Sequence, residues 1–190
     1  DVLLTVDAGR LFRAKEAGIL ASVDSEILNQ RIPSAYRDPE GEWYGLSLRS
    51  RVIMFDKSRV DASEIARYED LADPKWQGQV CIRSSGNIYN QSLLASLIEH
   101  LGEQATQDWA EGLVANMARR PQGGDRDQIR AVVAGQCKLA VANTYYLAGM
   151  LNSSVAADVE VAQQIGVLWP NQADRGAHMN VSGAGVIKTA

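Results

Sequence analysis

Two adjacent tyrosines, Tyr145 and Tyr146, stand in the stretch "NTYYLAGM", directly after the apolar run "CKLAVA". A phenol can fill a core, donate a hydrogen bond or, once deprotonated, act as a hard anionic ligand for a metal ion. If a helix begins here, successive side chains diverge by about 100° and cannot both enter the same core. The residues alone leave two interpretations open, a ligand held above the turn and amphipathic surface packing.

A second candidate site lies in "RSSGNIYNQSLL", where an expected strand ends at Arg83 and an expected helix begins near Tyr89. The free N–H groups of a helix start, together with the hydroxyls of Ser84 and Ser85, would suit an anion. An ordinary helix cap explains the same residues equally well. Tyr89 could also pack on the apolar stripe of the helix that follows it.

Catalytic motifs are absent from the sequence, which contains neither G-x-S-x-G nor H-E-x-x-H nor a Cys/His pairing. The stretch "GGDRDQIR" matches neither a phosphate loop nor a dinucleotide fingerprint, and predicts a helix capped by Asp125. His100 is expected in solvent, and His178 has no second histidine or carboxylate at ligand spacing. A hydrolase or transferase would need a reactive pair around Asp7 or His178, so we expect a protein that is not an enzyme.

Composition narrows the class of protein further. The chain has 190 residues, of which 46% are hydrophobic, and a net charge of −4. It is large enough for one or two cores, and its charge provides no attraction for nucleic acid or an anionic membrane. No apolar stretch approaches the roughly 20 residues of a membrane helix, and no signal peptide is recognisable. Both ends are expected to cut through structure.

Strand-like and helix-like runs alternate along the chain, which is typical of an α/β architecture. The expected strands are "DVLLTV", "GLSLRSRVIMFD", residues 80–83, the run through "CKLAVAN", "QIGVLWPN" and "HMNVSGAGVI". The expected helices are "AGRLFRAKEAGIL", "SLLASLIEHLG", "EQATQDWAEGLVANMARR" and the one that begins at Asp125.

The strand "GLSLRSRVIMFD" alternates in polarity, which predicts one buried and one polar face. A polar face with two arginines could line a cleft, although a solvated sheet face is the simpler interpretation. The buried face would hold Leu46, Leu48, Val52 and Met54, and the polar face Ser47, Arg49 and Arg51.

The two cysteines, Cys81 and Cys137, each follow a Gly-Gln pair near an expected strand. Their spacing is not that of a metal site, so they are either buried thiols or one disulfide between neighbouring strands. Composition alone favours buried thiols, because a disulfide requires an exported protein.

Several stretches together closely resemble the ferric-iron-binding periplasmic receptors of bacterial ABC transporters, of the cyanobacterial and marine type called iron-deficiency-induced protein A. The stretches are "DVLLTVDAGRL", "WYGLSLRSRVI", "YEDLADPKWQGQVCIRSSGNIYNQSLLAS", "PQGGDRDQIRAVVAGQCKLAVANTYY" and "PNQADRGAHMNVSGAGV". The resemblance covers nearly the whole chain. It implies a class II periplasmic binding protein with two α/β lobes joined by crossing strands.

The resemblance also implies a metal site. The family binds iron chiefly through tyrosines that match Tyr89, Tyr145 and Tyr146, and phenolate oxygen is a hard donor suited to Fe³⁺. Water or carbonate could complete the shell. An arginine that matches Arg49 lies close to the metal in the family. The other cleft residues expected around it are Asp7, Ser84, Ser85 and Asn143.

The domain division implied by the resemblance places residues 1–53 and 160–190 in lobe 1, which is expected to be incomplete, and residues 54–159 in lobe 2. The family's first tyrosine ligand, often with a histidine beside it, would precede Asp1. Val6 stands where some relatives have a carboxylate ligand, and "LAGM" follows the tyrosine pair where relatives often carry a basic residue.

The expected protein is a monomeric periplasmic receptor that delivers Fe³⁺ to the inner-membrane permease of an ABC transporter. It is not expected to bind nucleic acid or to insert into the membrane. Because the periplasm is oxidising, the resemblance also implies a Cys81–Cys137 disulfide. The alternative is a receptor of the same fold for a small organic or anionic solute, such as a polyamine, thiamine or a phosphonate, held by "SSGN" and Arg49.

Overall fold

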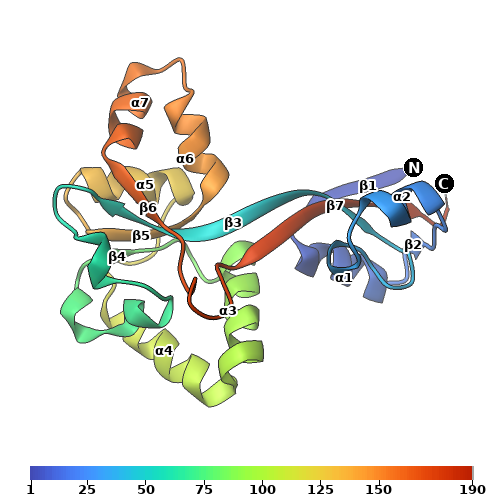
Figure 1. Cartoon of the computed structure of the whole chain (residues 1–190), viewed down its shortest axis with the longest axis horizontal. Coiled ribbons are helices and arrows are strands. Elements are labelled where there is room, and N and C mark those ends of the chain that lie inside the picture. Colours follow the sequence, from blue (N-terminus) through green and yellow to red (C-terminus); the bar gives the residue numbers. More distant parts are fainter. Residues whose placement is uncertain (190) are drawn as a thin grey trace. The chain divides into compact units, whose positions relative to one another are not determined.

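The computed structural model describes residues 1–189, which form two units with separate cores (Figure 1). The first unit holds Asp1–Arg49 and the segment that begins at Met179, and the second holds Ser50–His178. Helices and strands alternate as expected from the sequence. The predicted lobe boundaries remain a prediction for the whole protein.

The element bounds are as follows. The helices are α1 Ala8–Glu16, α2 Glu26–Arg31, α3 Ile88–Leu101, α4 Glu103–Ala115, α5 Asp125–Val133, α6 Thr144–Leu151 and α7 Ala156–Gln163. The strands are β1 Val2–Val6, β2 Leu20–Ala21, β3 Tyr44–Asp56, β4 Val80–Cys81, β5 Leu139–Asn143, β6 Ile165–Leu168 and β7 Met179–Ile187. No described helix is both long enough and apolar enough to cross a membrane.

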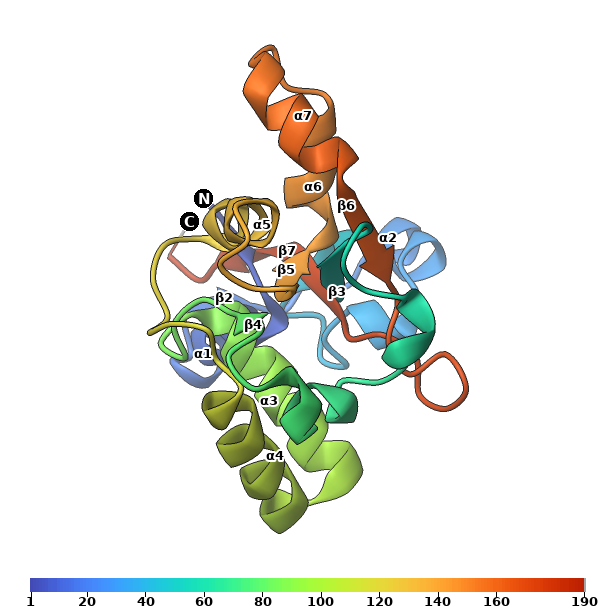
Figure 2. The same cartoon turned by 90° about the vertical axis from the view of Figure 1, so that its left-hand side faces the viewer.

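The second unit is a three-layer sandwich around a sheet of order β4-β5-β3-β6. Helices α3 and α4 cover one face, and α5, α6 and α7 cover the other (Figure 2). Successive residues of each strand enter different cores: Ile53 and Val141 pack toward α3 and α4, and Met54 and Ala142 toward α5 and α6. Because both faces are covered, these strands are continuous apolar runs.

Strand β3 departs from the predicted pattern of one buried and one polar face. Leu46 and Leu48 are 58% and 50% exposed, whereas Arg49 and Arg51 are only 7% and 1% exposed. The prediction was wrong for these four residues, although Val52 and Met54 are buried as expected. Only the part of β3 from Ser50 onward lies in the second unit, where helices cover both faces of the sheet and the alternation ends. The burial of the two arginines is tolerable because each has an acidic partner, Asp7 for Arg49 and Asp125 for Arg51.

A disulfide joins Cys81 at the end of β4 to Cys137, just before β5, with an S–S distance of 2.07 Å. The linkage closes a segment that contains α3, α4 and α5, since its cysteines are 56 residues apart. It ties β4 to β5, the two parallel strands that lead into α3 and α6.

Removing this disulfide is expected to destabilise the protein by about 2–4 kcal/mol, because the unfolded chain gains the freedom that the linkage denied it. The measurement compares the guanidinium unfolding curve of the double variant Cys81→Ala/Cys137→Ala with that of the oxidised wild type. Addition of dithiothreitol to the wild type should reproduce the loss, and should leave the unfolding curve of the double variant unchanged. Identical curves for oxidised and reduced wild type would contradict the expectation.

The first unit is built on β7, which pairs antiparallel with β1 and β2 and lies beside the first half of β3. Its core contains Leu11, Leu20, Tyr44 and Val181. Gly183 passes so close to the carbonyl of Tyr44 that an added Cβ would lie 2.5 Å from that oxygen, and so no larger residue fits there.

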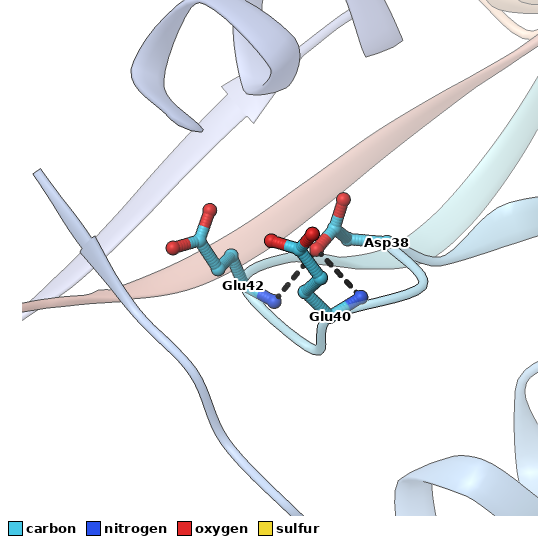
Figure 3. Close-up of side chains that lie close together, drawn as sticks. All are labelled: Asp38, Glu40 and Glu42. Atoms are coloured by element: carbon cyan, nitrogen blue, oxygen red, sulfur yellow. Dashed lines mark hydrogen bonds between the residues drawn. The ribbon is translucent and has the colours of Figure 1, made fainter. Parts of the chain in front are cut away.

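Three acidic residues of this unit, Asp38, Glu40 and Glu42, gather in the turn before β3 (Figure 3). Asp38 Oδ2 accepts hydrogen bonds from the backbone N–H groups of Glu40 and Glu42 at 3.0 and 3.2 Å. Lys15 Nζ lies 2.8 Å from Asp38 Oδ1 and 3.2 Å from Glu40 Oε2. Burial opposes ionisation of Asp38, but the hydrogen bonds from Lys15 and from the turn lower its pKa overall. These contacts account for the cluster as a turn built around one ionised carboxylate.

Candidate metal centre

Tyr89 and Tyr145 each stand second in a helix that begins beyond a strand of the second unit's sheet. Helix α3 starts after the turn that follows β4, where Asn87 Oδ1 caps it by accepting from the N–H of Tyr89 at 3.0 Å. Helix α6 starts directly at the end of β5. Strands β4 and β5 are parallel, so both helices begin at the carboxyl edge of the sheet, where α/β folds commonly bind their ligands.

The three predicted tyrosines come together at this edge. The Tyr145 hydroxyl donates a hydrogen bond to the Tyr89 hydroxyl at 3.3 Å, across 56 residues of sequence. The Tyr145 and Tyr146 rings lie with their centres 4.3 Å apart and their planes tilted by 36°. Tyr145 is 41% exposed, and the other two are partly buried, so a solute has access to the cluster.

The surroundings of Tyr145 keep it protonated while no metal is bound. Burial raises the pKa of its phenol, and the hydroxyls of Tyr146 and Tyr89 raise it further. The side chain of Asn143 acts in the opposite direction. Crowded phenols resist ionisation because each new negative charge would face another oxygen atom. A cation bound between these oxygens attracts the negative charge and so favours the ionised form.

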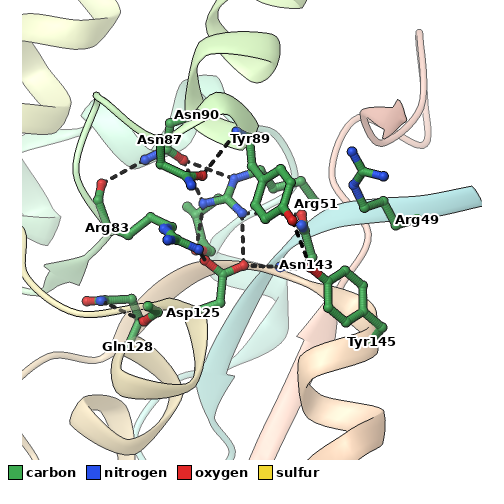
Figure 4. Close-up of polar contacts among 12 residues, drawn as sticks. Arg49, Arg51, Arg83, Asn87, Tyr89, Asn90, Asp125, Gln128, Asn143 and Tyr145 are labelled. Carbon is green, nitrogen blue, oxygen red and sulfur yellow. Dashed lines mark hydrogen bonds and ion pairs between the residues drawn. The ribbon is translucent and has the colours of Figure 1, made fainter. Parts of the chain in front are cut away.

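A buried ionic cluster forms the floor beneath the tyrosines (Figure 4). Asp125 is fully buried and accepts from Arg51 Nη1 at 3.0 Å and from Arg83 Nη1 at 3.3 Å. Burial lowers the pKa of Arg51, and the charge of Asp125 raises it again. Two arginines against one carboxylate leave the floor with a net positive charge.

Two asparagines connect this floor to the helix starts. Asn90 Oδ1 accepts from Arg51 Nη2 at 2.6 Å, and Asn90 Nδ2 donates to the Arg83 carbonyl at 2.7 Å. Asn143 stands opposite Arg51 in the β3–β5 register, and its Oδ1 accepts from Arg51 Nη1 at 3.2 Å. The backbone N–H of Asn143 donates to Asp125 Oδ2 at 2.8 Å. Arg51 and Asp125 therefore fix both helix starts that carry tyrosines.

The Nδ2 group of Asn143 is buried and finds no acceptor of good hydrogen-bond geometry among the described residues. Such a donor is uncommon in a folded protein and often marks a functional site. It belongs to the residue whose side chain lowers the pKa of Tyr145, so it lies where negative charge on that phenol would be stabilised.

Ser84 and Ser85 are exposed in the turn between β4 and α3. Ser84 Oγ accepts from the N–H of Gly86 at 3.2 Å, and the Ser85 carbonyl accepts from Gln91 Nε2 at 3.3 Å. The turn is thus held by its own hydrogen bonds. Both serines lie beside the helix start that carries Tyr89.

Asp7 and Arg49 belong to the first unit, where they form a buried ion pair. Asp7 Oδ2 lies 3.2 Å from Arg49 Nη2 and accepts from Asn180 Nδ2 at 3.0 Å, and Asp7 Oδ1 accepts from the N–H of Gly9 at 3.0 Å. Arg49 Nη1 also donates to the Ser182 hydroxyl at 2.9 Å. Asp7 therefore caps α1 and neutralises Arg49.

The sequence did not predict a role in the site for the residues of the floor, chiefly Arg51, Asn90 and Asp125. Asp125 was expected to cap α5, but Gly124 occupies that position and Asp125 is the first residue of the helix. The available signal was an arginine directly before the apolar run "VIMF", where a buried charge requires a partner. Nothing in the local pattern identifies that partner, because it depends on strand register.

Several known bacterial proteins are similar to this chain over its whole length. The chain is 54% identical to iron uptake protein A1 of Synechocystis over 190 residues, which is all of this chain and 53% of that protein. A Trichodesmium protein (IdiA, FutA) solved with iron and citrate is 54% identical with a TM-score of 0.97, matching all of this chain and 60% of that one. The ferric binding protein of Campylobacter jejuni is 41% identical, also with a TM-score of 0.97 and 60% coverage of that chain.

The chain spans about half the length of the curated relatives it matches, 53% and 56% of the two iron uptake proteins of Synechocystis. The predicted α/β class and the resemblance to ferric-binding receptors are both confirmed. The profile of the bacterial extracellular solute-binding protein family matches residues 1–188. The chain therefore belongs to the bacterial extracellular solute-binding proteins.

Proposed function

We propose that the protein is a receptor that binds Fe³⁺ as cargo through the phenolates of Tyr89, Tyr145 and Tyr146 and delivers it to an ABC permease. The observation that carries the proposal is the hydroxyl contact between Tyr89 and Tyr145, with the Tyr146 ring beside it. Side chains from two helix starts, 56 residues apart, meet through their oxygen atoms.

Charge and ligand hardness favour Fe³⁺ over other cargoes. Three phenolates carry three negative charges, which balance Fe³⁺ and over-compensate a divalent ion. Phenolate oxygen is a hard donor, and hard donors suit small, highly charged cations. Water or carbonate completes the coordination shell.

The surroundings of the cluster support phenolate formation. Arg83 lies 5.7 Å from the centre of the Tyr89 ring, and the floor beneath is positively charged. The buried Asn143 Nδ2, whose side chain lowers the pKa of Tyr145, supplies a donor for an oxygen that becomes negative. These groups stabilise the anionic form that iron requires, whereas burial and the hydroxyls of Tyr146 and Tyr89 raise the pKa of Tyr145 without iron.

The relatives support the same cargo, since iron uptake and ferric binding are named for them. The protein is proposed to work in the periplasm as a monomer, without catalysis. An oxidising compartment suits the Cys81–Cys137 disulfide.

The test is titration of the full-length apoprotein with ferric citrate, followed by visible absorption. We expect a phenolate-to-iron charge-transfer band that saturates at one Fe³⁺ per protein. Because burial raises the pKa of Tyr145, binding must displace its proton, and affinity should fall as the pH falls. Because binding would release three phenolic protons, the affinity for Fe³⁺ would fall by about a thousandfold for each unit by which the pH is lowered.

A panel of polyamines, thiamine and phosphonates, measured by calorimetry under the same conditions, serves as the comparison. Tight binding of one of these solutes, with no coloured iron complex at any pH, would show that the cleft serves an organic or anionic solute instead.

A further inference from the structure

Arg126 is the second residue of α5 and directly follows the buried Asp125. Successive helix residues point about 100° apart, so Asp125 enters the floor while Arg126 takes another direction. The guanidinium carbon of Arg126 lies 5.4 Å from the centre of the Tyr146 ring. One helix start thus supplies the anion of the floor and a cation at the side of the tyrosine cluster.

Gly149 of α6 leaves the space that this guanidinium occupies. It stands three residues after Tyr146, on the same side of the helix. A Cβ at Gly149 would lie 3.3 Å from Arg126 Nη2, which is closer than ordinary van der Waals contact. A methyl group at this position would therefore require the guanidinium to shift from its present place.

The alternative role of Arg126 is a surface ion pair with Asp158. That carboxylate already has a partner, because Arg130 Nη2 lies 2.8 Å from Asp158 Oδ1. The hydrogen bond from Arg130 is the main cause that lowers the pKa of Asp158, and the charge of Arg126 is a minor one. The contact with the Tyr146 ring is therefore the better account of where Arg126 lies.

We propose that Arg126 is a positioning residue for the Tyr146 phenolate and that Gly149 is small in order to admit it. This inference rests on the proposed Fe³⁺ site. A guanidinium over an aromatic ring fixes the ring's orientation, and its positive charge stabilises the negative charge that the phenolate carries when iron is bound.

The experiment compares four variants of the full-length protein: Arg126→Gln, Arg126→Lys, Gly149→Ala and Arg120→Gln. The measurements are Fe³⁺ affinity by citrate competition, the energy of the charge-transfer band, and thermal stability. Arg126→Gln should weaken iron binding by about tenfold and shift the band. Arg126→Lys should retain most of the affinity, and the control Arg120→Gln, at an exposed position of the second unit, should bind iron as the wild type does.

Gly149→Ala separates positioning from folding. Alanine stabilises a helix interior relative to glycine, so thermal stability should be unchanged or higher. Iron affinity should nevertheless fall by a few-fold, because the new methyl group displaces Arg126. The double variant Arg126→Gln/Gly149→Ala should bind iron no more weakly than Arg126→Gln alone, since both changes remove one contact.

Wild-type affinity and an unshifted band in Arg126→Gln would overturn the inference while leaving the iron site intact. Additive losses in the double variant would also overturn it, because Gly149 would then act independently of Arg126. A wild-type protein without any phenolate-to-iron band would overturn the proposed function, and this inference with it.

Discussion

We expect the full-length double variant Tyr145→Phe/Tyr146→Phe to lose the visible charge-transfer band. Its affinity for Fe³⁺ should fall by at least about a thousandfold. Changes to outer partners of metal ligands commonly cost 10–100-fold, and here two direct donors would be removed at once. Phenylalanine keeps the rings that pack 4.3 Å apart, so only the oxygens are lost. Absorption during ferric citrate titration measures both effects.

The control for this double variant is Tyr36→Phe, which removes a phenol from the first unit and should leave the band unchanged. Single variants at Tyr89, Tyr145 and Tyr146 should each shift the band and weaken binding. A double variant that still turned coloured with wild-type affinity would refute the assignment of these tyrosines as ligands.

Asp125→Asn is expected to cost about 3–5 kcal/mol of stability, although it changes the side-chain volume very little. Asp125 is fully buried and is the ion-pair partner of Arg51, which is 1% exposed, and of Arg83. Asparagine leaves the buried Arg51 and the partly buried Arg83 without a counter-charge where water has little access. For a domain of this size the loss corresponds to a fall of about 10 °C in melting temperature, measured by calorimetry.

The matched control is Asp127→Asn on the same helix, whose carboxylate is exposed and pairs with the exposed Arg130. That change should cost about 1 kcal/mol or less. A melting temperature of Asp125→Asn within about 2 °C of wild type would show that the buried pair is not needed for stability.

A second variant separates stability from iron binding. Replacing Arg51 and Asp125 together by Met and Leu removes both buried charges and should recover part of the lost stability. Iron affinity should remain low, because Asn90 and Asn143 would no longer be held in place by Arg51. Recovery of stability and affinity together would show that the floor does not position the tyrosines.

The sequence by itself determined the class of fold and the chemistry of the site. Alternating strand and helix patterns predicted the α/β architecture, because periods of 2 and 3.6 residues are local properties of the chain. The motifs "NIYNQS" and "NTYY" placed phenols beside turns, and the family resemblance implied both their role and the pairing of Cys81 with Cys137.

Tertiary structure alone decided what surrounds the phenols. The antiparallel register of β3 and β5 places Arg51 opposite Asn143, and so the arginine expected on a polar strand face is buried against Asp125. The meeting of Tyr89 with Tyr145 and the space that Gly149 leaves for Arg126 likewise depend on how α3, α5 and α6 pack. These contacts join residues far apart in the chain, and local periodicity carries no information about register or packing between distant segments.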